Sequence, residues 1–168
     1  MDQMTKPIED LGVAPDGCFD EVRDMPGHML RRFQQIAVSI FLKDCKPFDL
    51  TPVQFSVLAA LAQTSPLDQI RLCGLVALDR TTISLTVRKL EERGLVARQV
   101  SKEDRRARLI SLTPAGRALA EGVLPTVRAI QDKILAPLSP VEQDLFMALL
   151  HKAVKANNQQ SRAPLRGV

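Results

Sequence analysis

The sequence lacks most of the residues and motifs on which catalytic and metal sites depend. It has only two histidines, His28 and His151, far apart, and no HExxH, G-x-S-x-G, P-loop or dinucleotide-binding glycine pattern. Its three cysteines, Cys18, Cys45 and Cys73, are an odd number without any CxxC spacing, which argues against a disulfide framework and against a zinc site. We therefore expect no enzyme activity, no catalytic residues, no cofactor and no metal.

Long apolar runs are also absent. No stretch approaches the roughly 18 apolar residues of a membrane helix, and residues 1–16 carry acids and prolines where a signal peptide has lysines and then an apolar block. These features predict a cytoplasmic protein that makes no membrane contact. With 168 residues, of which 45% are apolar and 25% charged, the chain should form one globular domain. The net charge of +4 matters only if it is concentrated on one surface.

Apolar spacing and capping residues predict a mainly helical chain. Helices are expected over about 26–45, after Thr51-Pro52, over about 67–76, from Asp79 to Gly94, after Thr113-Pro114 and from Pro140. Pro125 should bend or interrupt the helix that follows Thr113-Pro114. The ends lack periodicity, so residues 1–25 are expected to be a flexible arm and residues 156–168 a flexible tail.

The helix expected after Asp79 has an apolar side and a polar side. Ile83, Val87 and Leu90 mark the side that should be buried. The opposite side has small hydroxyls in its first two turns and cations in the third; its residues are Thr81, Thr82, Ser84, Leu85, Arg88, Lys89 and Glu92. Small polar side chains at the start of a helix allow its backbone to approach a partner closely.

A β-hairpin with a basic tip follows this helix. Residues 95–100 and 108–112 have strand character, and the turn between them is dense in charge. Its cations, each able to neutralise a phosphate, are Lys102, Arg105, Arg106 and Arg108. Short helices followed by such a hairpin form a winged helix-turn-helix, in which one helix enters the major groove while the wing reaches phosphates or the minor groove. The fold class is therefore mainly α with a small β-hairpin.

Residues 78–116, LDRTTISLTVRKLEERGLVARQVSKEDRRARLISLTPAG, resemble the DNA-binding core of MarR-type bacterial transcriptional regulators. The likeness extends over residues 26–155. It implies a single domain in which residues 51–112 form a winged helix-turn-helix, with recognition helix 79–93 and wing 98–110, while residues 26–46 and 114–155 form a dimerisation region. It also implies a homodimer, a palindromic double-stranded DNA operator, and repression that a small molecule usually relieves.

The same resemblance assigns roles to individual residues. Major-groove positions match Thr81, Thr82, Ser84, Leu85 and Arg88. Arg106 matches the wing arginine that enters the minor groove, and Asp104 matches the acid that steadies it. Lys89 and the remaining wing cations complete the predicted DNA-binding set. The alternative for Arg88 and Lys89 is a solvated helix face with ion pairs at a spacing of four residues.

The segment PGHMLRRFQQIA mixes basic and apolar side chains near a helix start, as a site for an aromatic acid would. An arginine could pair with the carboxylate while a phenylalanine packs on the ring. The predicted ligand residues are His28, Arg31, Arg32, Phe33 and Phe48. The pattern resembles MarR-type members that control breakdown of aromatic acids such as hydroxylated nicotinates. Alternatively, His28 only caps or packs, and the arginines pair with nearby acids or with the partner chain.

Other functions stay open beside this one. Some MarR-type regulators sense oxidants through a cysteine whose thiolate is supported by tyrosine hydroxyls. Cys18 or Cys45 could be such a cysteine, but the chain has no tyrosine. A repressor that needs no ligand is a second alternative. A third is an interaction module whose basic hairpin binds an acidic protein.

Overall fold

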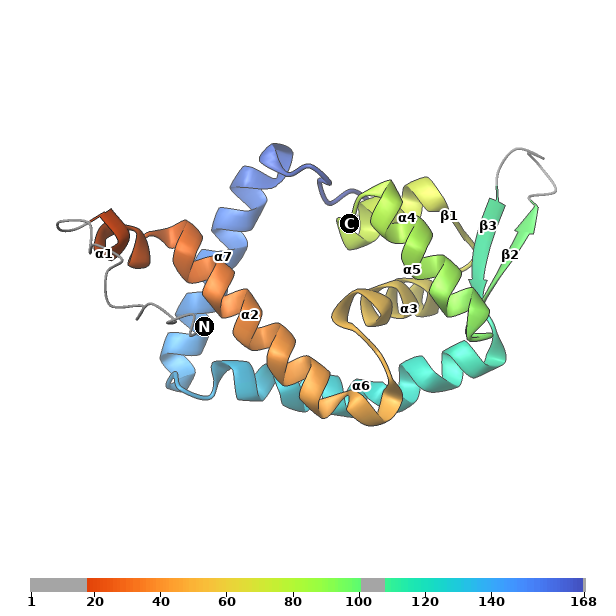
Figure 1. The fold of residues 1–168 in the computed structure, drawn as a ribbon, viewed down its shortest axis with the longest axis horizontal. Helices are drawn as coiled ribbons and strands as arrows, with labels where there is room; N and C mark the ends of the chain where they lie inside the picture. Colours follow the sequence, from red (N-terminus) through yellow and green to blue (C-terminus); the bar gives the residue numbers. More distant parts are fainter. Residues whose placement is uncertain (1–17, 101–107, 168) are drawn as a thin grey trace, which may run out of the picture. The chain divides into compact units, whose positions relative to one another are not determined.

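The computed structural model describes residues 18–100 and 108–167 (Figure 1). Contacts divide the chain into two units, residues 1–35 and 36–168, and each is described by itself. In its described part, the first unit contains α1 (Cys18–Arg23) and the beginning of α2 (Pro26–Asp44). A turn in which the Met25 N–H donates to the Val22 carbonyl, 3.1 Å away, separates the two helices. The expected helix over 26–45 is thus present, and α1 lies within the segment expected to be a flexible arm.

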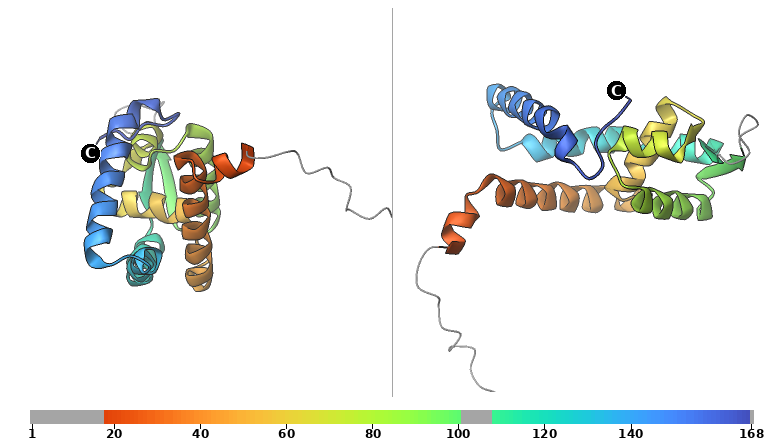
Figure 2. Two further views of the ribbon diagram at one scale, coloured as in Figure 1. Left: turned by 90° about the vertical axis from the view of Figure 1, so that its left-hand side faces the viewer. Right: turned by 90° about the horizontal axis from the view of Figure 1, so that it is seen from above.

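The second unit contains the end of α2 and all later elements (Figures 1 and 2). These elements are η2 (Lys46–Phe48), α3 (Pro52–Gln63), β1 (Leu67–Asp68), α4 (Gln69–Val76), α5 (Arg80–Glu92), β2 (Val96–Val100), β3 (Arg108–Leu112), α6 (Pro114–Leu135), α7 (Pro140–Asn157) and η3 (Asn158–Gln160). Within the described ranges, no helix is long and apolar enough to span a bilayer.

Side-chain caps fix where the helices of the second unit begin. Thr51 accepts a hydrogen bond from the Gln54 N–H at 3.2 Å, and the Gln54 side chain accepts one from the Thr51 N–H at 2.9 Å, which is a capping box. Asp79 and Thr113 likewise cap α5 and α6. The three starts predicted from sequence are confirmed, because a cap depends only on residues adjacent in the chain.

The sheet has three antiparallel strands in the order β1-β3-β2. In the hairpin, Val96 pairs with Leu112 and Val100 with Arg108, whereas on the other edge Leu67 pairs with Ile110. Residues 67 and 68 were expected to begin a helix, and this expectation is wrong. They form β1 instead, because Asp68 caps α4 by accepting from the Arg71 N–H at 2.8 Å, and the backbone before that cap is free to pair with β3.

The core of the second unit lies where α3 meets α4, α5, α6 and the sheet. Leu58 and Leu61 of α3, Ile83 of α5 and Ile130 of α6 are each fully buried. Burying four side chains of this size contributes about 2 kcal/mol each to folding. The helices that surround the candidate site are therefore held by one continuous apolar cluster.

Two further segments differ from the sequence-based expectation. α6 continues through Pro125, so the expected interruption is absent, while the alternative of a bend stays a prediction. The carbonyl that loses its donor belongs to the exposed Glu121, where water can replace the lost bond. Residues 156–168 were expected to be a flexible tail, yet α7 extends to Asn157 and the described residues after it return to α4. There the Arg166 N–H donates to the Gly74 carbonyl at 2.9 Å.

Gly116 allows the start of α6 to approach the start of β2. The Thr113 hydroxyl donates to the Gly94 carbonyl at 2.7 Å, and it accepts from the Gly116 N–H at 3.0 Å. A Cβ at position 116 would lie 1.9 Å from the carbonyl oxygen of Leu95. A side chain at this position is therefore excluded by backbone, which cannot move aside as a flexible side chain can.

We predict that Gly116→Ala destabilises the fold by about 3 kcal/mol, because α6 must move away from β2. The matched control is Gly122→Ala in the same helix, where an added Cβ would meet nothing within 4 Å. That variant should gain about 1 kcal/mol from helix propensity. Urea unfolding followed by circular dichroism measures both changes. Equal stability of the two variants would contradict the close approach.

Candidate nucleic-acid interface

Helix α5 has the two sides that its sequence predicted. Ile83, Val87 and Leu90 are buried, with exposed fractions of 2% or less. On the other side, the residues that are exposed are Thr81, Ser84, Leu85, Arg88 and Lys89. The helix therefore presents short side chains near its start and cations near its end, on a face that nothing in the described chain covers.

The first turn of α5 is ordered by Asp79. One carboxylate oxygen accepts from the Thr82 N–H at 2.9 Å, and the other accepts from the Thr82 hydroxyl at 2.7 Å. The backbone bond, followed by the hydroxyl bond, lowers the pKa of Asp79, so the cap stays charged at neutral pH. Thr82 is half-buried and its hydroxyl is already engaged, whereas the other predicted contact residues of α5 are exposed.

Arg80, the first residue of α5, was not among the predicted DNA-binding residues. Its side chain is exposed, and its carbonyl accepts from the side-chain amide of Gln69 at 3.1 Å, which ties the start of α5 to the start of α4. The sequence did contain a signal for Arg80, because a cap at Asp79 places residue 80 in the first turn of the recognition helix. A cation there lies on the approach to the small hydroxyl residues.

The cations at the end of α5 differ in their partners. Arg88 lies 3.6 Å from Glu92, and both side chains are more than 60% exposed, so this pair at a spacing of four residues is weak. Arg93 instead donates to the backbone carbonyls of Asp49 and Phe48. Arg93 thus anchors the end of α5 to the loop that precedes α3, whereas Arg88 can exchange its partner.

The wing is fixed to α5 by an ion pair that the sequence did not reveal. Arg98 of β2 lies 3.0 Å from the carboxylate of Glu91, and its side chain is 28% exposed. Beside it, a hollow of about 40 Å³ is lined by Gln69, Ser84, Val87, Arg98, Arg108 and Ile110. The structure thus brings together two of the predicted DNA-binding residues, Ser84 from the helix and Arg108 from the wing.

The structure does not describe the tip of the wing, which holds four of the predicted DNA-binding residues. Lys102, Asp104, Arg105 and Arg106 lie outside the described residues, and their roles stay predictions.

The five predicted ligand residues belong to different units. Arg31 and Arg32 are exposed on α2, and Arg31 donates to the Gln35 side chain at 3.0 Å. His28 and Phe33 are half-buried in the same unit, whereas Phe48 packs against the core of the other. A common ligand site for these residues stays a prediction.

Capped α3, α4 and α5, followed by a hairpin paired with a short third strand, define a winged helix-turn-helix protein. The family model described as MarR family matches residues 50–107. The chain is also 31% identical over 137 residues to the HTH-type transcriptional repressor NicR of Pseudomonas putida, an alignment that covers 82% of this chain and 87% of that protein. The chain belongs to the MarR family.

Two solved structures share this fold over most of their length. A probable transcriptional regulator from Pseudomonas aeruginosa is 39% identical, with a TM-score of 0.75, and the match covers 79% of this chain and 98% of that one. BpsR of Bordetella bronchiseptica, whose DNA binding is regulated by 6-hydroxynicotinic acid, is 35% identical, with a TM-score of 0.71 and coverage of 76% and 96%.

Proposed function

We propose that the chain is a homodimeric transcriptional repressor. It binds a palindromic operator through α5 and the wing, acts in the cytoplasm, is released by a small aromatic acid and catalyses no reaction. The observation that carries the proposal is the division of α5, whose apolar side is buried in the core while its hydroxyl-bearing and cationic side is exposed beside the wing. This arrangement suits insertion into a major groove about 12 Å wide.

The exposed side of α5 suits two kinds of DNA contact. Thr81 and Ser84 are short enough to let the helix backbone approach base edges, and Arg88 is long enough to hydrogen-bond to a guanine. Arg80 and Arg108 lie where phosphate contacts would position the helix. Because phosphate contacts release counterions, binding should weaken steeply as salt rises.

The apolar surface of α7 supports a dimer. Val141, Leu145 and Leu149 recur every four residues and are each more than 55% exposed, and no residue of α7 is buried within the described chain. Most of the stability of a helix in a protein comes from the packing of its apolar face, so an exposed apolar face of this kind indicates a surface for a partner. A second copy of the chain supplies the same face under two-fold symmetry, and symmetry also provides two half-sites about one duplex turn apart.

The relatives support an aromatic acid as effector. The regulation of BpsR by 6-hydroxynicotinic acid concerns a protein with the same fold and 35% identity. In this chain, α2 carries the exposed Arg31 and Arg32 and the half-buried Phe33 within one turn, so a partner for a carboxylate and an aromatic ring belong to the same short stretch of helix. We assign the effector to this part of α2.

The redox alternative has weaker support. Cys45 is fully buried, and burial followed by the nearby Asp44 raises the pKa of its thiol. A sensor thiol needs the opposite, a lowered pKa and access to solvent. The side chain of Cys18 lies outside the described part of the structure.

The DNA-binding proposal is tested with duplexes from upstream of the gene, by fluorescence anisotropy over a salt series. We expect nanomolar affinity that falls as salt rises. Arg88→Ala should change which operator variants are preferred, whereas Arg106→Ala should weaken binding to all of them and reduce the salt slope by about 1. Arg128→Ala, which removes an exposed cation of α6, is the control. Failure to bind at low salt, or an equal loss in the control, would reject the proposal.

The effector is tested by adding 6-hydroxynicotinate to the preformed DNA complex. We expect release of the duplex, and a release curve shifted at least tenfold to higher concentration in Arg32→Ala, because the carboxylate loses a charged partner. Absence of release would favour a repressor that needs no ligand of this class. Unchanged release in the variant would place the effector elsewhere.

The dimer is tested by placing a charge in the apolar face of α7. Leu149→Glu should raise the dimer dissociation constant more than a hundredfold, because burying an unpaired carboxylate costs about 3 kcal/mol or more. His151→Glu, an exposed position on another side of the same helix, should leave the constant within a fewfold of wild type. Sedimentation equilibrium measures both. A monomeric wild type, or equal effects of the two changes, would contradict the interface.

A further inference from the structure

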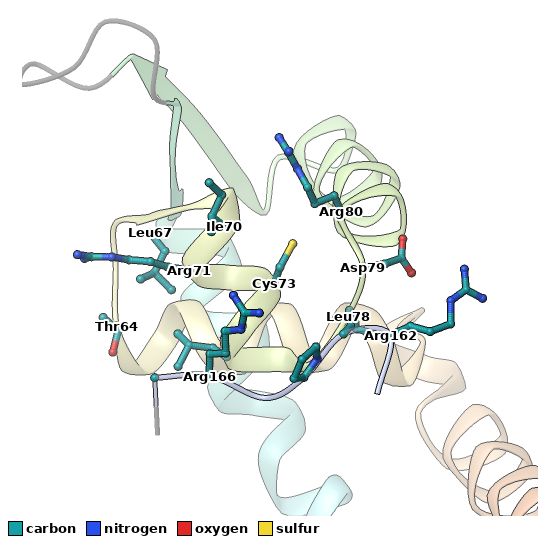
Figure 3. Close-up of a pocket in the computed structure, with 15 residues that line it drawn as sticks. Thr64, Leu67, Ile70, Arg71, Cys73, Leu78, Asp79, Arg80, Arg162 and Arg166 are labelled. Carbon is teal, nitrogen blue, oxygen red and sulfur yellow. The ribbon is translucent and has the colours of Figure 1, made fainter. Parts of the chain in front are cut away.

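A cavity of about 650 Å³ lies in the second unit between α4, the start of α5 and residues 162–167 (Figure 3). Its volume falls within the roughly 300–1,000 Å³ of ordinary small-molecule sites. Leu67, Ile70, Leu75, Leu78 and Pro164 supply most of its apolar wall. A small organic molecule that binds in the cavity would therefore bury apolar surface and displace water from this wall.

The rim of this cavity is strongly basic. The arginines that line it are Arg71, Arg80, Arg162 and Arg166. Asp79 is the only acid among the lining residues, and both of its oxygens bind Thr82. In the described ranges, only Arg71 of these arginines has an ion-pair partner, Asp68 at 3.7 Å. Three guanidinium groups are thus available to an anion.

Arg80 and Arg166 approach the cavity from different elements. Figure 3 shows Arg166 pointing back over α4 from the C-terminal segment, with Cys73 on the same helix, whereas Arg71 extends away. Burial raises the pKa of the Cys73 thiol, and the charge of Arg80 opposes this effect, so the field of Arg80 reaches the cavity wall.

The C-terminal segment is held in place as a wall. The Asn158 side chain bonds to both backbone groups of Leu165, at 2.9 and 3.1 Å, and the Arg166 N–H donates to the Gly74 carbonyl. Gly74 permits this approach, since a Cβ there would lie 3.1 Å from the Cβ of Arg166. The segment thus has a defined path across α4.

We propose that this cavity binds an organic anion with an apolar body, of the aryl carboxylate class. Arg80 and Arg166 pair with the carboxylate, and the apolar wall covers the body. An inorganic anion would leave the apolar wall unused, and a neutral apolar molecule would leave the arginines unpaired. This site is separate from the ligand residues of α2, and it includes the C-terminal segment.

The position of the cavity has a consequence for regulation, which rests on the proposed function. Asp79 and Arg80 both line the cavity and begin the helix assigned to the major groove. A bound carboxylate neutralises Arg80 and brings negative charge to the place where phosphates would approach. Occupancy of the cavity should therefore lower operator affinity.

The test uses 1-naphthoate as probe and 1-naphthamide as its uncharged match, titrated into the ¹⁵N-labelled full chain. We expect saturable shifts of the Gly74 and Ala163 amide signals with 1-naphthoate, and at least fivefold weaker binding of 1-naphthamide. Arg166→Ala should lower the affinity for 1-naphthoate at least fivefold, whereas Arg32→Ala and Arg128→Ala should leave this affinity unchanged. The proposal would be overturned if these amide signals showed no saturable shift, or if the two probes bound equally well. Both results come from the wild-type chain, so they hold even if a variant fails to fold.

Operator binding without probe is measured on the same proteins. Normal operator binding together with absent amide shifts rejects the cavity site alone. Amide shifts in a wild type that binds no operator reject the proposed function and leave the site standing. If 1-naphthoate saturates the amide shifts without lowering operator affinity, the site exists but the regulatory consequence is wrong.

Discussion

The junction between Gly94, Leu95 and Thr113 determines where the DNA-facing elements lie. The Thr113 N–H donates to the Leu95 carbonyl at 3.1 Å, while its hydroxyl bonds to Gly94 and caps α6. One residue therefore joins the end of α5, the base of the wing and the start of the long helix α6. The absence of a side chain at Gly116 makes this junction possible. The sequence LTPAG at residues 112–116, which ends the stretch that resembles MarR-type regulators, is thus explained by packing and needs no contact with DNA.

From this junction, the structure holds α5 more firmly at its end than at its start. At the end, Arg93 bonds to two carbonyls of the loop before α3, Glu91 pairs with Arg98 of the wing, and Gly94 is bound by Thr113. At the start, the side-chain hydrogen bonds are those of the Asp79 cap, which is local, and the bond from Gln69 to the Arg80 carbonyl, while Ile83 is buried in the core. The wing and the helix end therefore behave as one body.

The features that could be predicted from the sequence are those that depend on residues close together in the chain. The caps at Thr51, Asp79 and Thr113 and the buried stripe of α5 depend on neighbouring residues, and the sequence predicted them. β1 could not be predicted, because a two-residue strand exists only through its pairing with Ile110, more than forty positions away. The same holds for the Arg98 ion pair and for the return of the C-terminal segment, which needs Gly74. The cavity requires that return, and its arginines come from two stretches more than eighty positions apart, residues 71–80 and 162–166, so no local pattern indicated it.

The unequal anchoring of α5 bears on how a ligand could act. A ligand changes an equilibrium only by binding one arrangement better than another, and the cheapest rearrangement is the one that breaks the fewest contacts. In the first turns of α5, Ile83 fixes the apolar side, because it is fully buried in the core. The exposed side, which carries Thr81 and Ser84, is held at its start by the Asp79 cap and by the bond from Gln69 to the Arg80 carbonyl. The cavity reaches this turn through Asp79 and Arg80. A ligand there needs no path through the core, because it would act directly on the start of the helix that meets the DNA.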